Sequence, residues 1–445
     1  MKKYFYLILL IFTGILFLCI LLFSKEPKKP NTGLKNRTGS IDLAGEWMDT
    51  KNAVKSLLEE IELNPSNFTA KLNLAQAYIQ ESRVTGDHGY YDSQALNLLN
   101  EVIENEPKNF DALCCKSAVL LSQHHFSDAL QIAKKALPLN PHNAFIYGLM
   151  CDAYVELGYY EEAVKMTDLM ISIRPDIRSY SRISYLREIH GDLPGAIEAS
   201  KFAVNSGLPG LEETAWARMI LAHLYEDIGA LDSAEYHYRT ALIERPNYAY
   251  ALAGLGKLEK SNKDYKNAIR LYEKAERSIT EYSFSDDLTE LYWLNSQKRK
   301  SKENAKRVIA ILSPMGGNDE SVTGHGHYAD KELAYAYLKN DEFALAIKHA
   351  LIEYKRRPKN IEVCELLAWT YYKNKQYVKA NQYIDKALKT NCKSPELLCR
   401  SGLIKLKNKD FSAAKTLLND ALHNHPLLND FELAVASKKA LAIIN

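Results

Sequence analysis

The feature that most constrains this chain is a repeat of about 34 residues. Prolines expected near helix ends recur every 34 residues at positions 107, 141, 175 and 209, and further prolines stand at 246, 358 and 426. A period of this length is typical of stacked two-helix units, each of which buries its apolar face only against its neighbours. The 445 residues are therefore predicted to form one repeat array rather than two or three globular domains.

Pairs of small residues twelve positions apart form a second pattern. Two antiparallel helices joined by a short turn approach closely only where neither side chain is large, so each pair predicts a contact within a hairpin. The pattern predicts an all-α solenoid of about ten helical hairpins. The pairs are Ser117 and Ala129, Cys151 and Ala163, Ser184 and Ala196, Ala222 and Ala234, Gly256 and Ala268, Ala334 and Ala346, Ala368 and Ala380, and Gly402 and Ala414.

Two stretches add further matching positions. In ARMILAHLYEDIGALDSAEYHYRTALIERP (217–246) they are Leu221, Ala222, Tyr225, Gly229, Ala234, Tyr238, Ala241 and Pro246. In ELLAWTYYKNKQYVKANQYIDKAL (365–388) they are Leu367, Ala368, Tyr371, Ala380 and Ala387. Over about 42–426 the chain resembles the tetratricopeptide repeat (TPR) family, whose pattern is W-x2-L-G-x2-Y in the first helix and A-x3-F-x2-A, then proline, in the second.

The resemblance implies a function as well as a fold. Members of this family bind peptides and protein segments in a concave groove lined by the first helix of each hairpin, and they catalyse no reaction. It therefore implies a chain that is not an enzyme and has no cofactor. Counted from the small pairs, the candidate groove residues combine aromatic and Met side chains with scattered charges, as binding hot spots do. They are Phe145, Asp152, Arg178, Tyr185, Trp216, Met219, His223, Tyr250, Lys257, Tyr328, Tyr335, Trp369 and Tyr372.

Departures from the period predict insertions near 80–94, 205–213 and 313–327. Repeat seven, at about 281–316, is expected to be degenerate, because Trp293 stands twelve positions before Ala305 where other repeats have a small residue. A large ring at that contact is expected to force the helices apart. Residues 427–445 are predicted to form a C-terminal capping helix that covers the last apolar face.

The first residues differ from the array. The segment YFYLILLIFTGILFLCILLF (4–23) is uncharged and has the length that a membrane-spanning helix requires, roughly 20 residues. We expect 1–24 to be an uncleaved membrane anchor. A cleaved signal peptide would show small residues before Ser24, and a lipoprotein would have a small residue where Leu18 precedes Cys19. The polar stretch 25–41 is expected to be a flexible spacer.

The charges around 4–23 bear on which side of the membrane the array faces. The positive-inside rule would keep the array in the cytosol, because more basic residues follow the segment than precede it. A short basic start before an apolar run is, however, how an export signal begins. By a small margin we favour an exported, periplasmic array. The basic residues are Lys2 and Lys3 before the segment and Lys25, Lys28, Lys29, Lys35 and Arg37 after it.

Overall charge and cysteines restrict the function classes. The chain has 57 Lys and Arg against 55 Asp and Glu, a formal charge of +2, which does not support a general nucleic-acid binder. The six cysteines beyond Cys19 form no CxxC pair and no even spacing, so buried thiols are expected rather than a disulfide framework. The charge balance thus predicts no nucleic-acid partner, while the resemblance implies protein or peptide partners.

The motif GHGHY (324–328) suggests an alternative chemistry. His325, His327 and Asp330, with Asp319 nearby, are residue types that bind zinc or another first-row ion. Flanking glycines usually mark a turn, however, and H-x-H holds both rings on one side most readily in a strand. A loop lengthened at an irregular junction is the favoured interpretation.

Three functional hypotheses follow. The leading one is a membrane-tethered TPR scaffold of a bacterial type that binds partner proteins in its groove. The second is a metal-binding or metal-handling protein that uses the 319–330 loop. The third is a cytosol-facing regulator that binds a linear peptide.

Overall fold

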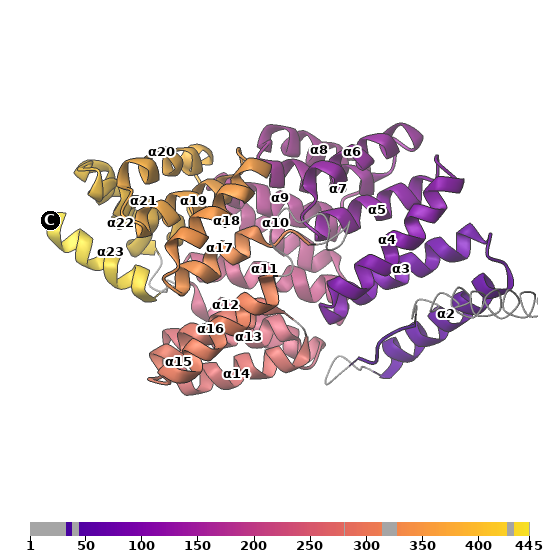
Figure 1. Ribbon diagram of the computed structural model, residues 1–445, viewed down its shortest axis with the longest axis horizontal. Helices are drawn as coiled ribbons and strands as arrows, with labels where there is room; N and C mark the ends of the chain where they lie inside the picture. The colour runs from indigo at the N-terminus through magenta and orange to yellow at the C-terminus, as the bar shows by residue number, and fades with distance from the viewer. Residues whose placement is uncertain (1–32, 38–43, 280, 314–326, 425–430, 445) are drawn as a thin grey trace, which may run out of the picture.

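The computed structural model describes residues 33–37, 44–279, 281–313, 327–424 and 431–444. In these ranges α-helices follow one another in chain order and stack into a superhelix (Figure 1). The helices are α2 (Ala44–Leu63), α3 (Phe68–Thr85), α4 (His88–Asn105), α5 (Phe110–Ser122), α6 (Phe126–Ala136), α7 (Ala144–Leu157), α8 (Tyr160–Ile173), α9 (Ile177–Ile189), α10 (Leu193–Ser206), α11 (Glu212–Asp227), α12 (Leu231–Glu244), α13 (Ala249–Ser261), α14 (Tyr265–Ser278), α15 (Tyr282–Leu294), α16 (Lys298–Leu312), α17 (Asp330–Lys339), α18 (Phe343–Arg356), α19 (Ile361–Lys373), α20 (Tyr377–Ala387), α21 (Pro395–Lys407), α22 (Phe411–Asn424) and α23 (Phe431–Ile444).

Consecutive helices pair as ten hairpins in the described ranges, from α3 with α4 to α21 with α22. Helix α2 precedes the first hairpin, and α23 packs on both helices of the last. Several helices begin at an Asn whose side chain accepts a hydrogen bond from the first turn, as at Asn67, Asn109 and Asn360. The all-α solenoid predicted from the repeat is confirmed.

The small residues lie where the two helices of a hairpin meet, as predicted. The second-helix alanines of the pairs are fully buried. Where the first-helix residue is serine, its hydroxyl donates a hydrogen bond to the carbonyl of the paired alanine, at 2.9 Å for Ser117 and Ala129 and 2.8 Å for Ser184 and Ala196. A side chain longer than these would meet the facing backbone.

Each hairpin turn contains one residue with a left-handed backbone. Beyond the first repeat it lies seven positions after the small residue of the first helix, and it is not always glycine. A left-handed backbone strains residues that have a Cβ atom. The ten residues are Gly86, His124, Gly158, Gly191, Gly229, Lys263, Ser296, Asp341, Lys375 and Lys409, with φ between 59° and 80°.

Repeat seven corrects the prediction made from Trp293. Helices α15 and α16 pack closely, because the contact lies between Thr289 and Ser301, whose hydroxyl donates to the Thr289 carbonyl at 2.8 Å. The left-handed turn residue, Ser296, is seven positions after Thr289 and confirms this register. Trp293 lies one turn further along α15 and is 46% exposed. The pairing of Trp293 with Ala305 was a coincidence of spacing, because Thr and Ser also serve as small contact residues.

The insertions take different forms. With the corrected register, the interval from Ala268 to Ser301 is 33 residues and that from Ser301 to Ala346 is 45, so the added residues fall together between α16 and α17. The insertion near 80–94 lengthens α3 and α4 to 18 residues each, and only Gly86 and Asp87 separate them.

Residues 33–37 pack on the first hairpin, which differs from the flexible spacer expected for 25–41. Arg37 and Glu81 form an ion pair in which both side chains are fully buried, with 2.5 Å between Nη2 and Oε1. The Tyr90 hydroxyl donates to the Gly33 carbonyl at 2.7 Å. Residues 25–32 and 38–41 lie outside the described residues.

The prediction of a membrane-spanning helix before the solenoid is corrected. Among the described helices none combines the length and the apolar character needed to cross a bilayer. The segment 4–23, on which the prediction depended, lies outside the described residues. The single-pass, membrane-anchored localisation inferred from it is corrected for the same reason.

The superhelix brings repeats two to four into contact with repeats eight to ten, and we call this contact the seam (Figure 1). The Tyr328 backbone N–H donates to the Gln123 carbonyl at 3.1 Å. Arg357 forms an ion pair with Glu156, and the Asn360 amide donates to the Glu156 carbonyl at 3.0 Å. Because a single apolar cluster contains buried residues from both sides, the seam is part of the core.

At one point of the seam two backbones approach so closely that only glycine fits. Gly158 has φ of 80°, and a Cβ atom there would lie 2.2 Å from the Lys359 backbone carbon. A second turn makes a similar approach, since a Cβ at Gly191 would lie 2.4 Å from the Asn391 carbonyl oxygen. Both glycines are therefore required by the neighbouring superhelical turn as well as by their own hairpins.

The corrected register of repeat seven is testable by two substitutions. Ser301→Leu overfills the contact with Thr289 and removes a hydrogen bond, so it is expected to lower the free energy of unfolding by about 1 to 3 kcal/mol. Trp293→Ala is expected to cost less than about 1 kcal/mol, because the ring is half exposed. Denaturant unfolding of both variants measures this order, and the reverse order would restore the Trp293 register.

The seam is testable through its glycines. Gly158→Ala should destabilise the chain by more than the roughly 1 to 2 kcal/mol expected from left-handed backbone strain alone, because the added methyl meets the Lys359 backbone. Gly229→Ala is the matched control, since Gly229 has φ of 73° in the α11–α12 turn, which lies between the two sides of the seam in sequence. Hydrogen exchange should show faster exchange of the 356–361 amides only in Gly158→Ala. Equal effects of the two variants would argue against a close seam.

Candidate binding groove

The first helices of successive hairpins contact one another along the superhelix, as α7 does with α9 and α17 with α19. We call the surface made by their side chains the inner face. One row of it consists of residues one position after the small contact residue. This row contains six of the predicted groove residues, Asp152, Tyr185, His223, Lys257, Tyr335 and Trp369.

Asp152 on α7 and Arg182 on α9 form a two-pronged ion pair. Arg182 Nε donates to Oδ1 at 2.8 Å and Nη2 to Oδ2 at 2.5 Å. Beside them is a small pocket of about 120 Å³, which Cys151 and Tyr185 also line. The pair fixes the spacing of two neighbouring first helices and leaves polar atoms at the mouth of the pocket.

A carboxylate-rich cluster surrounds His223 on α11. His223 Nδ1 lies 3.4 Å from Glu226 and Nε2 lies 4.0 Å from Asp227, while Lys257 on α13 reaches Glu226 at 4.0 Å. Although burial lowers the pKa of His223, the carboxylates of Asp227 and Glu226 raise it to about 9, so the ring is a cation at neutral pH.

Two carboxyls of the same cluster are poorly compensated. Burial, with the nearby Asp227 and Glu362 adding to it, raises the pKa of Glu188 to about 7. Burial, with Glu396 and Glu226 adding to it, raises the pKa of Asp227 to about 6. Both groups would gain free energy from one more cation close by.

Side chains from distant repeats meet on the inner face. The Tyr185 hydroxyl on α9 donates to Glu362 Oε1 on α19 at 3.3 Å, and Lys331 on α17 pairs with the same carboxylate. The Lys331 ammonium holds the pKa of Glu362 at about 2. Glu362 nevertheless keeps 42% of its side chain exposed, so this part of the inner face remains accessible to solvent.

Arg400 on α21 connects two of the predicted aromatic residues. Its Nη1 donates to Glu365 at 2.9 Å and to the Tyr335 hydroxyl at 3.3 Å. Its guanidinium lies 5.5 Å from the Trp369 ring centroid, and Trp369 stacks on Tyr372 at 4.8 Å. These rings are held by neighbours, and Trp369 is mostly buried.

A second row, near the start of the first helices, is aromatic. Trp216 is 41% exposed and packs edge to face on Tyr250, whose ring also contacts Phe284. At the other end of the row, Arg178 lies over the Phe145 ring at 5.8 Å. Exposed aromatic area beside a charged row is suited to binding a polypeptide.

The structure places the other predicted residues elsewhere. Met219 is buried in the core between α11 and its neighbours, and Tyr328 lies in the seam, where Arg356 covers its ring at 3.8 Å. Asp330 is fully buried and pairs with His349 and Arg356 at 2.6 Å each, so it does not act as the metal ligand expected from the GHGHY motif. His325 lies outside the described residues.

Several charged groove residues were missed by the sequence analysis. Glu188 is three positions after Tyr185, and Asp227 is four positions after His223. Residues three or four positions apart share one face of a helix, so counting one turn beyond the first row would have found them. Arg182 lacked such a signal, because its role depends on Asp152 in the preceding repeat.

Acidic side chains outnumber basic ones on the described inner face. This excess makes it a poor surface for a polyanion and a good one for a cationic ligand. The acidic residues are Asp152, Glu188, Glu226, Asp227, Asp286, Asp287, Glu290, Glu362, Glu365 and Glu396, and the basic ones are Arg178, Arg182, Lys257, Lys260, Lys331, Lys339 and Arg400, with His223 as a further cation.

Two groups of three side chains in the described ranges have the composition of metal ligands. They are Glu188, His223 and Asp227 on the inner face, and His124, His327 and Glu332 at the seam. In the first group both nitrogens of His223 face carboxylates and the ring is protonated, so it offers no lone pair to a metal.

Comparison with known proteins gives matches to repeat proteins. The family model described as "Tetratricopeptide repeat" matches residues 120–187. Human interferon-induced protein with tetratricopeptide repeats 2 is 28% identical over 125 residues, which are 28% of this chain and 25% of that protein. The match therefore spans only about a quarter of that relative's length.

Two solved structures are similar over longer stretches. The human IFIT1 dimer with PPP-AAAA is 13% identical, covers 77% of this chain and 80% of its own, and has a TM-score of 0.47. The APC/C hetero-tetramer Cut9-Hcn1 is 17% identical, covers 84% of this chain and 64% of its own, and has a TM-score of 0.39.

The family match covers the segment from α5 to α9, and the same hairpin, with its small contact and left-handed turn, recurs along the described helices. Over residues 120–187 the chain thus matches the tetratricopeptide repeat family, and its other described hairpins have the same architecture.

Proposed function

We propose that this chain is a scaffold that binds a protein segment along its inner face and that the segment is rich in Lys and Arg. The observation that carries the proposal is the pair of half-buried, partly compensated carboxyls, Glu188 and Asp227, on the same inner face as an aromatic row in which Trp216 is exposed. Proteins built from these repeats bind protein or peptide partners. We infer no catalysis by the inner face, and its role in this proposal is binding alone.

The aromatic row supports a polypeptide as the ligand. Trp216, with Tyr250 and Phe284 behind it, offers a rigid surface on which an apolar side chain or a peptide plane packs. The charged row lies seven residues, or about two helical turns, further along the same helices, as His223 does from Trp216. A ligand in contact with both rows therefore meets apolar and charged surface together. Anchors of the first kind supply affinity, and charges set the register.

The carboxylates support a basic ligand. The His223 cation compensates Glu188 and Asp227 only in part, since their pKa values stay raised. A Lys or Arg side chain placed beside Glu188 and Asp227 would add a second cation, and their pKa values would fall on binding. Ion pairs of this partly buried kind are worth more than surface pairs, because water screens them less. IFIT1 was solved with PPP-AAAA. PPP-AAAA is a polyanion, whereas the acidic inner face of this chain favours a cationic ligand.

The test is a direct binding measurement with defined probes. A fluorescent peptide of alternating lysine and alanine is expected to bind, whereas a glutamate–alanine peptide and a 5′-triphosphate RNA are expected not to bind. The double variant Glu188→Gln, Asp227→Asn should weaken binding of the lysine peptide by about tenfold or more, because each lost pair removes roughly 1 kcal/mol. Fluorescence anisotropy measures all three probes.

A matched control changes the same residue types on the outer surface. Glu161 and Asp168 lie exposed on α8, so Glu161→Gln, Asp168→Asn should leave binding of the lysine peptide unchanged. Equal weakening by both double variants would mean that net charge and not the inner face attracts the peptide. Tighter binding of the RNA than of the lysine peptide would overturn the proposal.

The proposal also predicts a pH dependence. Glu188 and Asp227 become ionised as the pH rises through about 7 and about 6. Affinity for the lysine peptide is therefore expected to increase from pH 5.5 to pH 8, and the increase should be smaller in the double variant. An affinity that is flat over this range in the wild-type chain would contradict the assignment of these two carboxyls.

The same carboxyls predict a cost in stability. A carboxyl whose pKa is higher in the folded than in the unfolded chain takes up a proton on folding, so stability falls as the pH rises from about 4 to about 7. Glu188→Gln is therefore expected to raise the melting temperature at pH 8 and to change it little at pH 4.5. A lower melting temperature at pH 8 would assign Glu188 a structural role instead.

A further inference from the structure

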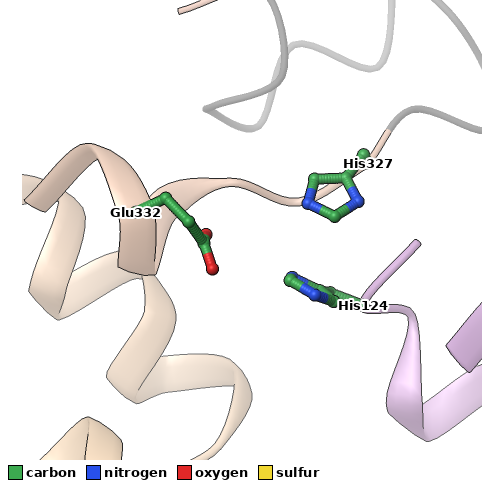
Figure 2. A group of neighbouring side chains, drawn as sticks. All are labelled: His124, His327 and Glu332. Atoms are coloured by element: carbon green, nitrogen blue, oxygen red, sulfur yellow. The ribbon is translucent and has the colours of Figure 1, made fainter. Parts of the chain in front are cut away.

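Three side chains with the composition of a metal site meet at the seam, away from the inner-face cluster. His124 is the left-handed residue of the α5–α6 turn, His327 lies three residues before α17, and Glu332 lies in the first turn of α17. Figure 2 shows the Glu332 carboxylate and the two imidazole rings turned toward a common space. The potential ligand atoms all lie within 4.8 Å of one another.

Backbone hydrogen bonds orient both imidazole rings. His124 Nδ1–H donates to the Tyr328 carbonyl at 3.0 Å, and this leaves the Nε2 lone pair available. His327 has a hydrogen bond with the Ser122 backbone, which engages one of its two ring nitrogens. The ring centroids are 4.2 Å apart. Metal-binding histidines are commonly oriented in this way, with one nitrogen on a carbonyl and the other on the ion.

Glu332 has a buried oxygen that the protein leaves unsatisfied. The residue is only 8% exposed, and its Oε2 atom has no hydrogen-bond partner among the described residues. A buried carboxylate oxygen without a hydrogen-bond partner loses the hydration that it has in the unfolded chain and gains nothing in exchange. This oxygen is a second observation, independent of the two histidines, that calls for a positive ligand at the same place.

We propose that His124, His327 and Glu332 bind one divalent transition-metal ion, best matched by Zn²⁺, and that this ion fastens repeat two to repeat eight. Two imidazoles and one carboxylate form a known ligand set for zinc, with a fourth position left for water. Tetrahedral coordination at about 2.0 to 2.1 Å places ligand atoms roughly 3.3 Å apart. The ligand atoms here lie within 4.8 Å of one another, so the three side chains would move closer together when the ion binds. Of the ligands expected from GHGHY only His327 belongs to this set, and its partners come from another repeat and from α17.

The test uses the full chain, without a histidine tag and stripped of metal, titrated with Zn²⁺ alone by calorimetry. One ion per chain is expected to bind, and His124→Ala, His327→Ala and Glu332→Gln should each weaken binding by about a hundredfold. Co²⁺ in place of Zn²⁺ should give the visible absorption of a four-coordinate ion. Zn²⁺ should also raise the melting temperature of the wild-type chain and leave that of the three variants unchanged.

Controls separate this site from other histidines. His142→Ala changes an exposed histidine near the start of α7 and should leave Zn²⁺ binding unchanged. Glu332→Gln preserves the shape of the side chain, and circular dichroism checks that each variant is folded. Failure of the folded wild-type chain to bind Zn²⁺ would overturn the proposal. Loss of binding in His325→Ala with full binding in Glu332→Gln would overturn it too, since the ligands would then be those of the motif.

Discussion

The two helices of each hairpin approach one another at a contact between two small side chains, and the geometry of the superhelix depends on that short distance. At Ser117 and Ser184 the contact includes a hydrogen bond to the facing carbonyl, which is possible only because the helices are so close. Because nearly the same hairpin is repeated, each hairpin is rotated by a similar angle relative to the hairpin before it. After six repeats this rotation brings the chain back onto itself, and Arg357 reaches Glu156.

The seam differs from the contact at which the two helices of a hairpin meet. That contact is made by small side chains, whereas the seam includes buried and half-buried charge, as in Arg357 with Glu156. Charged pairs of this kind stabilise weakly but penalise wrong partners strongly, so they fix the register in which one turn of the superhelix meets the next. The inner face takes its shape from that register, because Tyr185 and Glu362 meet across it.

The sequence predicted the hairpins well because the packing limit at the helix contact is local. A large residue does not fit at Ala163 or Ala234, because both are fully buried at the helix contact. The small residues therefore recur from repeat to repeat, although the other positions of the repeats differ. Local reasoning failed at Trp293, where another small pair, Thr289 and Ser301, lay four residues earlier in the same helices. The membrane-spanning helix inferred from the hydropathy of 4–23 is not found among the described helices, and that segment lies outside the described residues.

The candidate site was only partly predictable for a related reason. The residues of the first inner row follow from helix periodicity. Glu188 and Asp227, one turn further along the same helices, could have been predicted by the same counting. Contacts such as that between His124 and Tyr328 join residues 204 positions apart, and their position depends on the accumulated rotation of six hairpins. No pattern within one repeat specifies that rotation. A motif search therefore could not have identified the residues that lie next to His327.

The left-handed turns and the seam together imply an order of assembly. Each hairpin closes with contacts between residues about a dozen positions apart, and such local contacts form early and fast. The seam must wait until repeat eight exists, because it joins segments some two hundred residues apart at a larger cost in chain entropy. A chain emerging from the ribosome is thus an open spiral before it is a closed one. During that interval the inner helices are open from the side, before the turns of the superhelix meet at the seam.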